Sequence, residues 1–411
     1  MPVIEFSMVQ SIGFAVLLLV IGRWLRRNVY FFERFAIPSA VIGGFLFAII
    51  NLFLHIFEIV DIQFDTTLQT FFMIIFFTSI GFGASPRILK AAGPKVAKFL
   101  IVAAVLCVFQ NLIPFLLADV LGVSKGIALM TGSTPMTGGH GTSGGIAPLV
   151  EAAGFKGAEA VAYTAATFGL VAGSLMGGPL ANHLIQKKDL LHKRDKAEVG
   201  DELDESLLAQ AQRMLSSDRI LRAFLVMLIA MFLGSYVTDL LNLFVSNLTT
   251  MAQFPAYLGP MLFGILARAI SDANLKKDGG KWTVPSEEIE IVGNVGLNLF
   301  LAMALMSVRL WELADLAVPM AVLLGAQLVL MFVYARFVTF KVMGSTYDAA
   351  VLTSGHCGFG MGATPNGVAN MESIVDKYLP SKTAFFVLPI VGGMFIDFVN
   401  ILVITGFMYF I

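Results

Sequence analysis

The sequence predicts an all-α polytopic membrane protein with two inverted five-span repeats, each carrying a re-entrant Gly-rich loop. Three observations support this fold class: a very apolar composition, ten apolar segments of membrane-spanning length, and two glycine-rich segments at matching positions in the two halves. Of 411 residues, 57% are hydrophobic and 13% are charged, whereas a soluble domain carries about 25% charged residues. The mean hydropathy is +0.83.

This composition excludes a soluble globular enzyme and a disordered chain. A net charge of -1 provides no basic surface, so we expect no nucleic-acid partner. Two cysteines, Cys107 and Cys357, are too few for a disulfide framework.

Ten segments approach the roughly 20 apolar residues that a spanning helix needs. The predicted spans are residues 3–22, 36–56, 67–85, 97–118, 161–184, 219–245, 255–273, 291–308, 317–336 and 383–410. The first is expected to stay in the protein, because residues 1–7 lack the Lys or Arg that opens a secretory signal. Residues 126–150 and 347–370 are too rich in Gly, Ser and Thr for ordinary spans, although their flanks suggest that they enter the membrane.

The distribution of basic residues predicts the orientation. With both termini outside, alternate loops place 24 of the 27 Lys and Arg residues in the cytoplasm and leave outside only Lys125, Lys156 and Arg309. Basic residues are enriched in short cytoplasmic loops, so this orientation is favoured over its inverse. The count holds only if residues 126–150 and 347–370 each return to the side from which they came. Both are therefore predicted to be re-entrant.

One extended polar stretch divides the chain. We predict an N-terminal repeat over residues 1–185, a cytoplasmic linker over residues 186–218, and a C-terminal inverted repeat over residues 219–411. The linker is interpreted as a solvated connection in preference to a partner site. Ser85 matches Ser307 and Pro38 matches Pro260 at an offset of 222 residues, and His140 matches His356 at 216. Inverted repeats with broken helices at matching positions are typical of secondary transporters.

The two glycine-rich segments are the candidate solute site. Glycine lets the backbone unwind and lets a ligand approach its amides closely, and exposed backbone persists at membrane depth only against protein, water or a polar solute. Hydroxyls add ligands for a cation. The alternatives are tight helix packing and ordinary surface loops; packing explains the run from Gly173 to Pro179 well, but it does not require a histidine beside glycines in both halves.

Other polar residues lie deep in predicted spans. Asp397 and Asn400 share one face of the last span, and an intramembrane carboxylate is a functional candidate by default. The alternative is a hydrogen bond to a neighbouring helix, and for Asp348, Asn366, Asn370, Gln110 and Asn111 packing is an equally good explanation. For His140 and His356, a structural role as anchors of the loops is slightly preferred over a role in binding. Neither has zinc-type ligand spacing, and Cys357 beside His356 lacks the geometry of a nucleophile–base pair.

No Lys or Arg lies within either glycine-rich segment. An anionic substrate would therefore be held by amides, hydroxyls, histidine or co-bound cations. Anion binding would then depend on a cation, which is a physical form of coupling.

Several motifs carry a resemblance that covers nearly the whole chain. They are Gly138-Gly139-His140-Gly141-Thr142, Asn294-Val295-Gly296, Leu310-Trp311-Glu312-Leu313, Tyr347-Asp348-Ala349-Ala350-Val351, Gly355-His356-Cys357-Gly358-Phe359-Gly360 and Gly362-Ala363-Thr364-Pro365. The sequence resembles the bacterial sodium/glutamate symporter family. It departs from the usual family pattern at Thr137, where members often have Ser, and at Ser143, where they often have Gly.

The resemblance implies sodium-coupled uptake of L-glutamate across the inner membrane by a homodimer in which part of each subunit moves, with Na⁺ as coupling ion, no other cofactor or metal, and no enzymatic activity. We assign the substrate site to Thr137, Gly138, Gly139, His140, Gly141, Thr142, Gly355, His356, Cys357, Gly358, Phe359, Gly360 and Gly362. Candidate sodium ligands are Ser133, Thr134, Asp348, Thr364, Asp397 and Asn400. The alternative function is a sodium- or proton-coupled carrier of another amino acid or dicarboxylate. A channel or a membrane enzyme is less compatible with these motifs.

Overall fold

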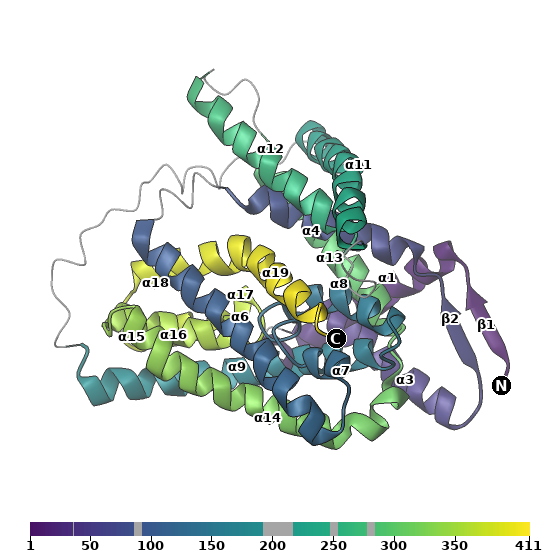
Figure 1. Cartoon of the computed structure of the whole chain (residues 1–411), viewed down its shortest axis with the longest axis horizontal. Coiled ribbons are helices and arrows are strands. Elements are labelled where there is room, and N and C mark those ends of the chain that lie inside the picture. The colour runs from purple at the N-terminus through teal and green to yellow at the C-terminus, as the bar shows by residue number, and fades with distance from the viewer. Residues whose placement is uncertain (36, 86–92, 192–216, 247–253, 278–283) are drawn as a thin grey trace.

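In the part of the chain that the structure describes, the fold is helical apart from one pair of short strands (Figure 1). The computed structural model describes residues 1–35, 37–85, 93–191, 217–246, 254–277 and 284–411. Each predicted span coincides with a helix or a run of helices. These are α1 (Met8–Asn28), α3 (Ser39–Ile56), α4 (Thr67–Gly83), α6 (Gly93–Leu121), α9 (Ala158–Lys188), α11 (Ser217–Ser246), α12 (Leu258–Lys277), α13 (Ser286–Met306), α14 (Ala317–Tyr334) with η4 (Ala335–Thr339) and α15 (Phe340–Val342), and α18 (Lys382–Ile390) with η5 (Val391–Phe395) and α19 (Ile396–Met408).

The described residues contain seven helices that are long and apolar enough to cross a membrane. The count rises to eight if the last segment, which bends by 46° between Gly393 and Ile396, is one span. Of the other predicted spans, α4 has only 17 residues and α12 carries Arg268 and Asp272 in its middle. The prediction of a multi-pass membrane protein is therefore confirmed.

The beginning of the first span was predicted incorrectly. Residues Val3–Phe6 form strand β1, which pairs in parallel with β2 (Asp61–Phe64), and α1 begins only at Met8. The reason is a capping box: Ser7 and Gln10 each accept a hydrogen bond from the other's backbone N–H, which fixes the start of the helix after Ser7.

The long helices form two bundles, each with its own apolar core. The larger core joins α6, α8 (Gly139–Ala152), α9, α14, α16 (Tyr347–Gly360), α17 (Thr364–Val375), α18 and α19. In the second bundle, α1, α3 and α13 share one core, and α4, α11 and α12 pack beside them. Each half of the sequence contributes helices to both bundles, so the two halves are interleaved in space.

Small residues bring α9 close to α16. A Cβ atom added to Gly169, Gly173 or Gly177 would lie 2.1 Å, 2.7 Å or 2.6 Å from a backbone carbonyl oxygen of residues 361, 357 or 354. These glycines recur every four residues and therefore share one helix face. The packing explanation for this glycine-rich run is thus confirmed.

Most of the predicted linker lies outside the described residues. The helix before it, α9, ends at Lys188, and the helix after it, α11, begins at Ser217. Several basic residues that set the predicted orientation, including Arg87, Lys90 and Arg213, also lie outside the described residues.

Candidate functional site

The two glycine-rich segments meet inside the larger bundle. In the first segment, α7 (Lys125–Leu129) is followed by turns up to Gly138, and α8 begins at Gly139. Gly139 has a φ of 60°, and a Cβ atom there would lie 2.6 Å from the carbonyl oxygen of Gly362. Only glycine fits this conformation and this contact without strain. Segments 223 residues apart therefore touch at Gly139 and Gly362.

The second segment unwinds less than its glycine content predicts. Residues Tyr347–Gly360 are helical, a short break covers residues 361–363, and α17 begins at Thr364. Close packing of α16 against α9 and α17 explains why a glycine-rich sequence remains helical here, because tertiary contacts override intrinsic propensity.

Gln110 on α6 links both segments. Its side chain donates through Nε2 to the carbonyl of Gly360 at 2.6 Å and accepts through Oε1 from the hydroxyl of Thr137 at 2.7 Å. Its own carbonyl accepts from Nε2 of Gln327 on α14 at 2.6 Å. That carbonyl would normally accept from residue 114, but proline has no N–H. Gln327 therefore replaces a helix hydrogen bond that Pro114 removes.

Several buried oxygens near this crossing have no donor among the described residues, and those of Asn400, Thr134 and Gln327 are among them. Asn400 donates through Nδ2 to the carbonyl of Ser133 at 3.1 Å, which leaves its Oδ1 unpartnered. The hydroxyl oxygen of Thr134 is also unpartnered, and both residues are fully buried. The Ser133 hydroxyl, in contrast, accepts from Asn111 Nδ2 at 2.7 Å. Orphaned oxygen atoms of this kind are the ligands that a hard cation needs.

The other predicted sodium ligands do not all lie at the crossing. Asp397 lies on the same helix as Asn400, is half-buried, and has no ion-pair or hydrogen-bond partner within the described part of the chain. Its carboxylate is within electrostatic reach of Cys107 and Tyr257. The Thr364 hydroxyl lies beside Gly392 in the π-helical turn that precedes Asp397.

Asp348 lies apart from the crossing. It is at the first turn of α16 and accepts a hydrogen bond from the Ser381 hydroxyl at 2.6 Å. Twelve residues of helix at 1.5 Å each place it about 18 Å along the axis from Gly360. The structure therefore does not bring Asp348 together with the other five candidates.

Both histidines bind threonine hydroxyls. His140 Nε2 lies 3.0 Å from Thr167 Oγ1, and His356 Nδ1 lies 2.8 Å from Thr339 Oγ1. His356 is fully buried, packs against the rings of Phe99 and Phe359, and has no partner at Nε2 among the described residues. These contacts agree with the interpretation of the histidines as anchors.

The predicted substrate residues separate into three groups. Thr137, Gly138, Gly139, Gly360 and Gly362 lie at the crossing. The backbone of Gly355 faces Met371 and Leu388, that of Gly358 faces Asn366, and that of Cys357 faces Gly173, so these three pack against neighbouring helices. Gly141 lies against Phe76, Thr142 is buried against Gly138, and Phe359 is buried beside His356.

Sequence reasoning did not single out Gln327, Thr167 or Thr339. Gln327 had a detectable signal, because it is an isolated polar residue in an apolar span and follows Gln110 by 217 residues, close to the offset of the other repeat matches. Thr167 and Thr339 carry no signal, since a threonine in a membrane helix usually bonds to its own backbone.

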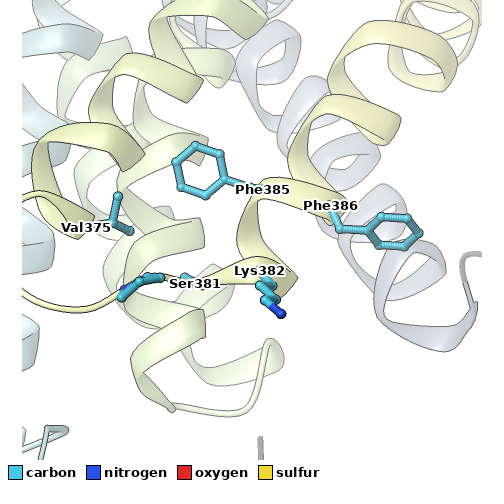
Figure 2. Close-up of a pocket in the computed structure, with 6 residues that line it drawn as sticks. Val375, Ser381, Lys382, Phe385 and Phe386 are labelled. Atoms are coloured by element: carbon cyan, nitrogen blue, oxygen red, sulfur yellow. The ribbon is translucent and has the colours of Figure 1, made fainter. Parts of the chain in front are cut away.

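An apolar cavity of about 550 Å³ lies between α9 and α14, and two further cavities lie away from the crossing. One of about 320 Å³ opens at the start of α18, where Phe385, Phe386 and Val375 leave little polar surface (Figure 2). The other, of about 390 Å³, is strongly polar and lies where β2, α4, α9 and η3 (Leu310–Leu316) converge. Within the described residues, no group of three or more His, Cys, Asp or Glu residues is placed to hold a metal ion.

Known proteins match this chain along most of its length. A family profile described as sodium/glutamate symporter matches residues 4–380. A sodium/glutamate symporter from Haemophilus influenzae is 36% identical over 397 residues, covering 96% of this chain and 95% of the relative. One from Escherichia coli is 39% identical over 392 residues, covering 95% and 94%.

The chain belongs to the sodium/glutamate symporter family. Members of this family are transporters, so the expectation that the chain is not an enzyme is confirmed. A solved sodium/proton antiporter from Methanocaldococcus jannaschii is also similar, with a TM-score of 0.42, 15% identity and coverage of 98% of this chain and 94% of that chain. No conclusion about this symporter depends on that likeness.

Proposed function

We propose that this sodium/glutamate symporter carries L-glutamate and Na⁺ together by alternating access, and that both bind where the two glycine-rich segments cross. Family membership supports the symport of glutamate with sodium. The observation that carries the location of the site is the contact between Gly139 and Gly362 beside the orphaned oxygens of Thr134 and Asn400.

The chemistry of the crossing suits coupled binding. Hydroxyl, amide and carbonyl oxygens surround the contact, and Asp397 is the carboxylate on the same helix as Asn400. We assign Na⁺ to Thr134, Asn400 and Asp397, with Ser133 and Thr364 beside them. No Lys or Arg is in either segment, so bound Na⁺ would supply positive charge for the substrate carboxylates, and each ligand would strengthen binding of the other.

The arrangement of the helices supports an inverted repeat. Each half contributes to both bundles, and α8 and α16, with 14 residues each, are about 21 Å long and thus too short to cross a bilayer. We infer that the two segments are re-entrant, that both termini lie outside a bacterial inner membrane, and that the protein works as a homodimer in which the larger bundle moves against the second.

The decisive experiment is uptake of radiolabelled L-glutamate into proteoliposomes of the purified protein. An inward Na⁺ gradient should drive uphill accumulation, and an equal K⁺ gradient should not. Accumulation driven equally by a proton gradient without Na⁺, or competition by other dicarboxylates in preference to glutamate, would favour the alternative carrier.

Asp397→Asn should weaken sodium activation more than it lowers the amount of folded protein; unchanged sodium activation would remove Asp397 from the site.

Membrane voltage measures the coupling ratio in the same vesicles. A tenfold Na⁺ gradient is worth about 1.4 kcal/mol per ion, and 100 mV adds about 2.3 kcal/mol per net charge moved. One Na⁺ with one glutamate anion moves no net charge, so a potassium diffusion potential would leave uptake unchanged. Two or more Na⁺ would make a negative interior accelerate it.

A further inference from the structure

The polar cavity away from the crossing has an excess of negative charge. Four carboxylates line it, and Arg309 is the one basic residue among the lining residues; the carboxylates belong to Asp61 on β2, Glu151 on α8, Glu159 on α9 and Glu312 on η3. Arg309 offsets only one of these four negative charges; it lies 3.8 Å from Glu312, and its side chain is 62% exposed.

Two of these carboxylates already have partners. Glu151 accepts a hydrogen bond from the backbone N–H of Glu159 at 3.0 Å, in the first turn of α9, where the helix dipole favours negative charge. Asp61 accepts from Gln63 at 3.1 Å. Burial raises the pKa of Glu151, and Glu312 raises it further, as expected where buried negative charges crowd together.

The other two carboxylates and one amide have unused oxygens. The side chain of Glu159 has no hydrogen bond or ion pair within the described ranges, and Glu312 has only the long contact with Arg309. Gln69 on α4 lines the same cavity, is 9% exposed, and leaves its Oε1 without a donor. A buried amide oxygen without a donor costs free energy unless a ligand or water satisfies it.

We propose that this cavity binds a hydrated monovalent cation, with Glu159, Glu312 and Gln69 supplying oxygen ligands directly or through water. The charge favours a cation over glutamate, which is itself an anion. The geometry disfavours a chelated divalent ion, because no three acidic side chains in the described structure converge closely enough to enclose one. A stacking contact between Trp311 and His55, whose ring centroids are 3.9 Å apart, stabilises the wall beside the site.

The cation would join both bundles. Glu159 belongs to a helix of the larger bundle, whereas Gln69 belongs to α4 in the second bundle. Its occupancy would therefore stabilise the present arrangement of the bundles. This inference does not depend on the proposed glutamate site.

The test measures the thermal unfolding midpoint of the full-length protein in nanodiscs, in NaCl and in choline chloride at equal ionic strength. Wild-type protein should be stabilised by Na⁺. In choline chloride, the double variant Glu159→Gln/Glu312→Gln should unfold at a higher temperature than wild type, because carboxylate repulsion is removed. With Asn400→Ala added to remove the contribution of the crossing, the response of the double variant to Na⁺ should need at least tenfold more salt than that of Asn400→Ala alone. The matched control is Glu33→Gln/Glu290→Gln, which removes two exposed carboxylates elsewhere and should behave as wild type.

Three further measurements separate this site from the crossing and from a structural role. In an Asn400→Ala background the cavity should still respond to Na⁺; loss of the entire response there would overturn the cavity and support the crossing. Gln69→Leu, which changes no charge, should weaken the response several-fold. A double variant less stable than wild type in choline chloride would show a structural cluster and overturn the proposal. The proposal would also be overturned if lower pH stabilised wild-type protein while Na⁺ did not, because the ligand would then be a proton.

Discussion

The crossing of the two glycine-rich segments and the acidic cavity satisfy their polar groups in opposite ways. At the crossing, neutral amides and hydroxyls bind one another, and a few buried oxygens remain without a donor among the described residues, including those of Thr134, Asn400 and Gln327. In the cavity, like charges face one another, with one exposed arginine among the lining residues. A buried network of neutral groups can bind an anion together with a cation. A cavity near helix ends that is lined by carboxylates instead favours cations over anions. We infer from this comparison that the crossing is suited to specific binding and the cavity to selection by charge.

The largest effect on transport is expected from a substitution at Gly139. Gly139→Ala places a Cβ in a left-handed conformation and against the carbonyl of Gly362, which costs about 1–3 kcal/mol and separates the two segments. We expect sodium-driven glutamate uptake to fall at least 100-fold. Gly13→Ala is the control, because a Cβ there meets nothing within 4 Å. Normal uptake by Gly139→Ala would show that the contact is dispensable.

The next effect concerns the orphaned amide of Asn400. Asn400→Ala removes the bond to Ser133 and the free Oδ1, so the Na⁺ concentration that half-activates uptake should rise about tenfold or more. Uptake measured against Na⁺ concentration at saturating glutamate tests this. Asn28→Ala, which removes an exposed bond to Trp24, should leave sodium activation unchanged. If both variants keep wild-type activation, Na⁺ binds elsewhere.

A smaller effect is expected at Gln327, and it concerns stability. Gln327→Leu leaves the carbonyl of Gln110 without a donor, which should lower stability by about 1–3 kcal/mol. Adding Pro114→Ala restores a backbone N–H four residues along α6 and should recover most of the loss. Thermal unfolding of both single variants and the double variant measures this coupling. Additive losses would contradict the idea that Gln327 replaces the missing helix bond.

The smallest effect on stability is expected at Arg309, and it sharpens the contrast with the crossing. An exposed ion pair is worth about 0–1 kcal/mol, so Arg309→Gln should barely change the unfolding midpoint in choline chloride. Because it removes a positive charge from the cavity, it should strengthen the stabilising response to Na⁺. A weaker response would mean that Arg309 organises the cavity and does not oppose the cation.

The sequence predicts the helices well because most of the spans are long and apolar. The start of α1 was wrong because window hydropathy registers neither the capping box of Ser7 and Gln10 nor the pairing of β1 with β2, which joins residues nearly 60 positions apart. The crossing was predictable from glycine content and the repeat offset. The roles of Gln110 and Gln327 were not, since they depend on which carbonyl Pro114 leaves unsatisfied and which neighbouring helix can reach it. The acidic cavity was missed because its residues come from five separate parts of the chain and form no local motif.

The shared carbonyl of Gly360 has a mechanical consequence. The same oxygen accepts from Gln110 on α6 and lies 3.5 Å from the hydroxyl of Thr137 on the first segment. Neither segment can move away from this carbonyl without giving up a buried hydrogen bond. We infer that the two segments stay joined during transport, so that exposure of the proposed site to the other side would require the larger bundle to move as one body.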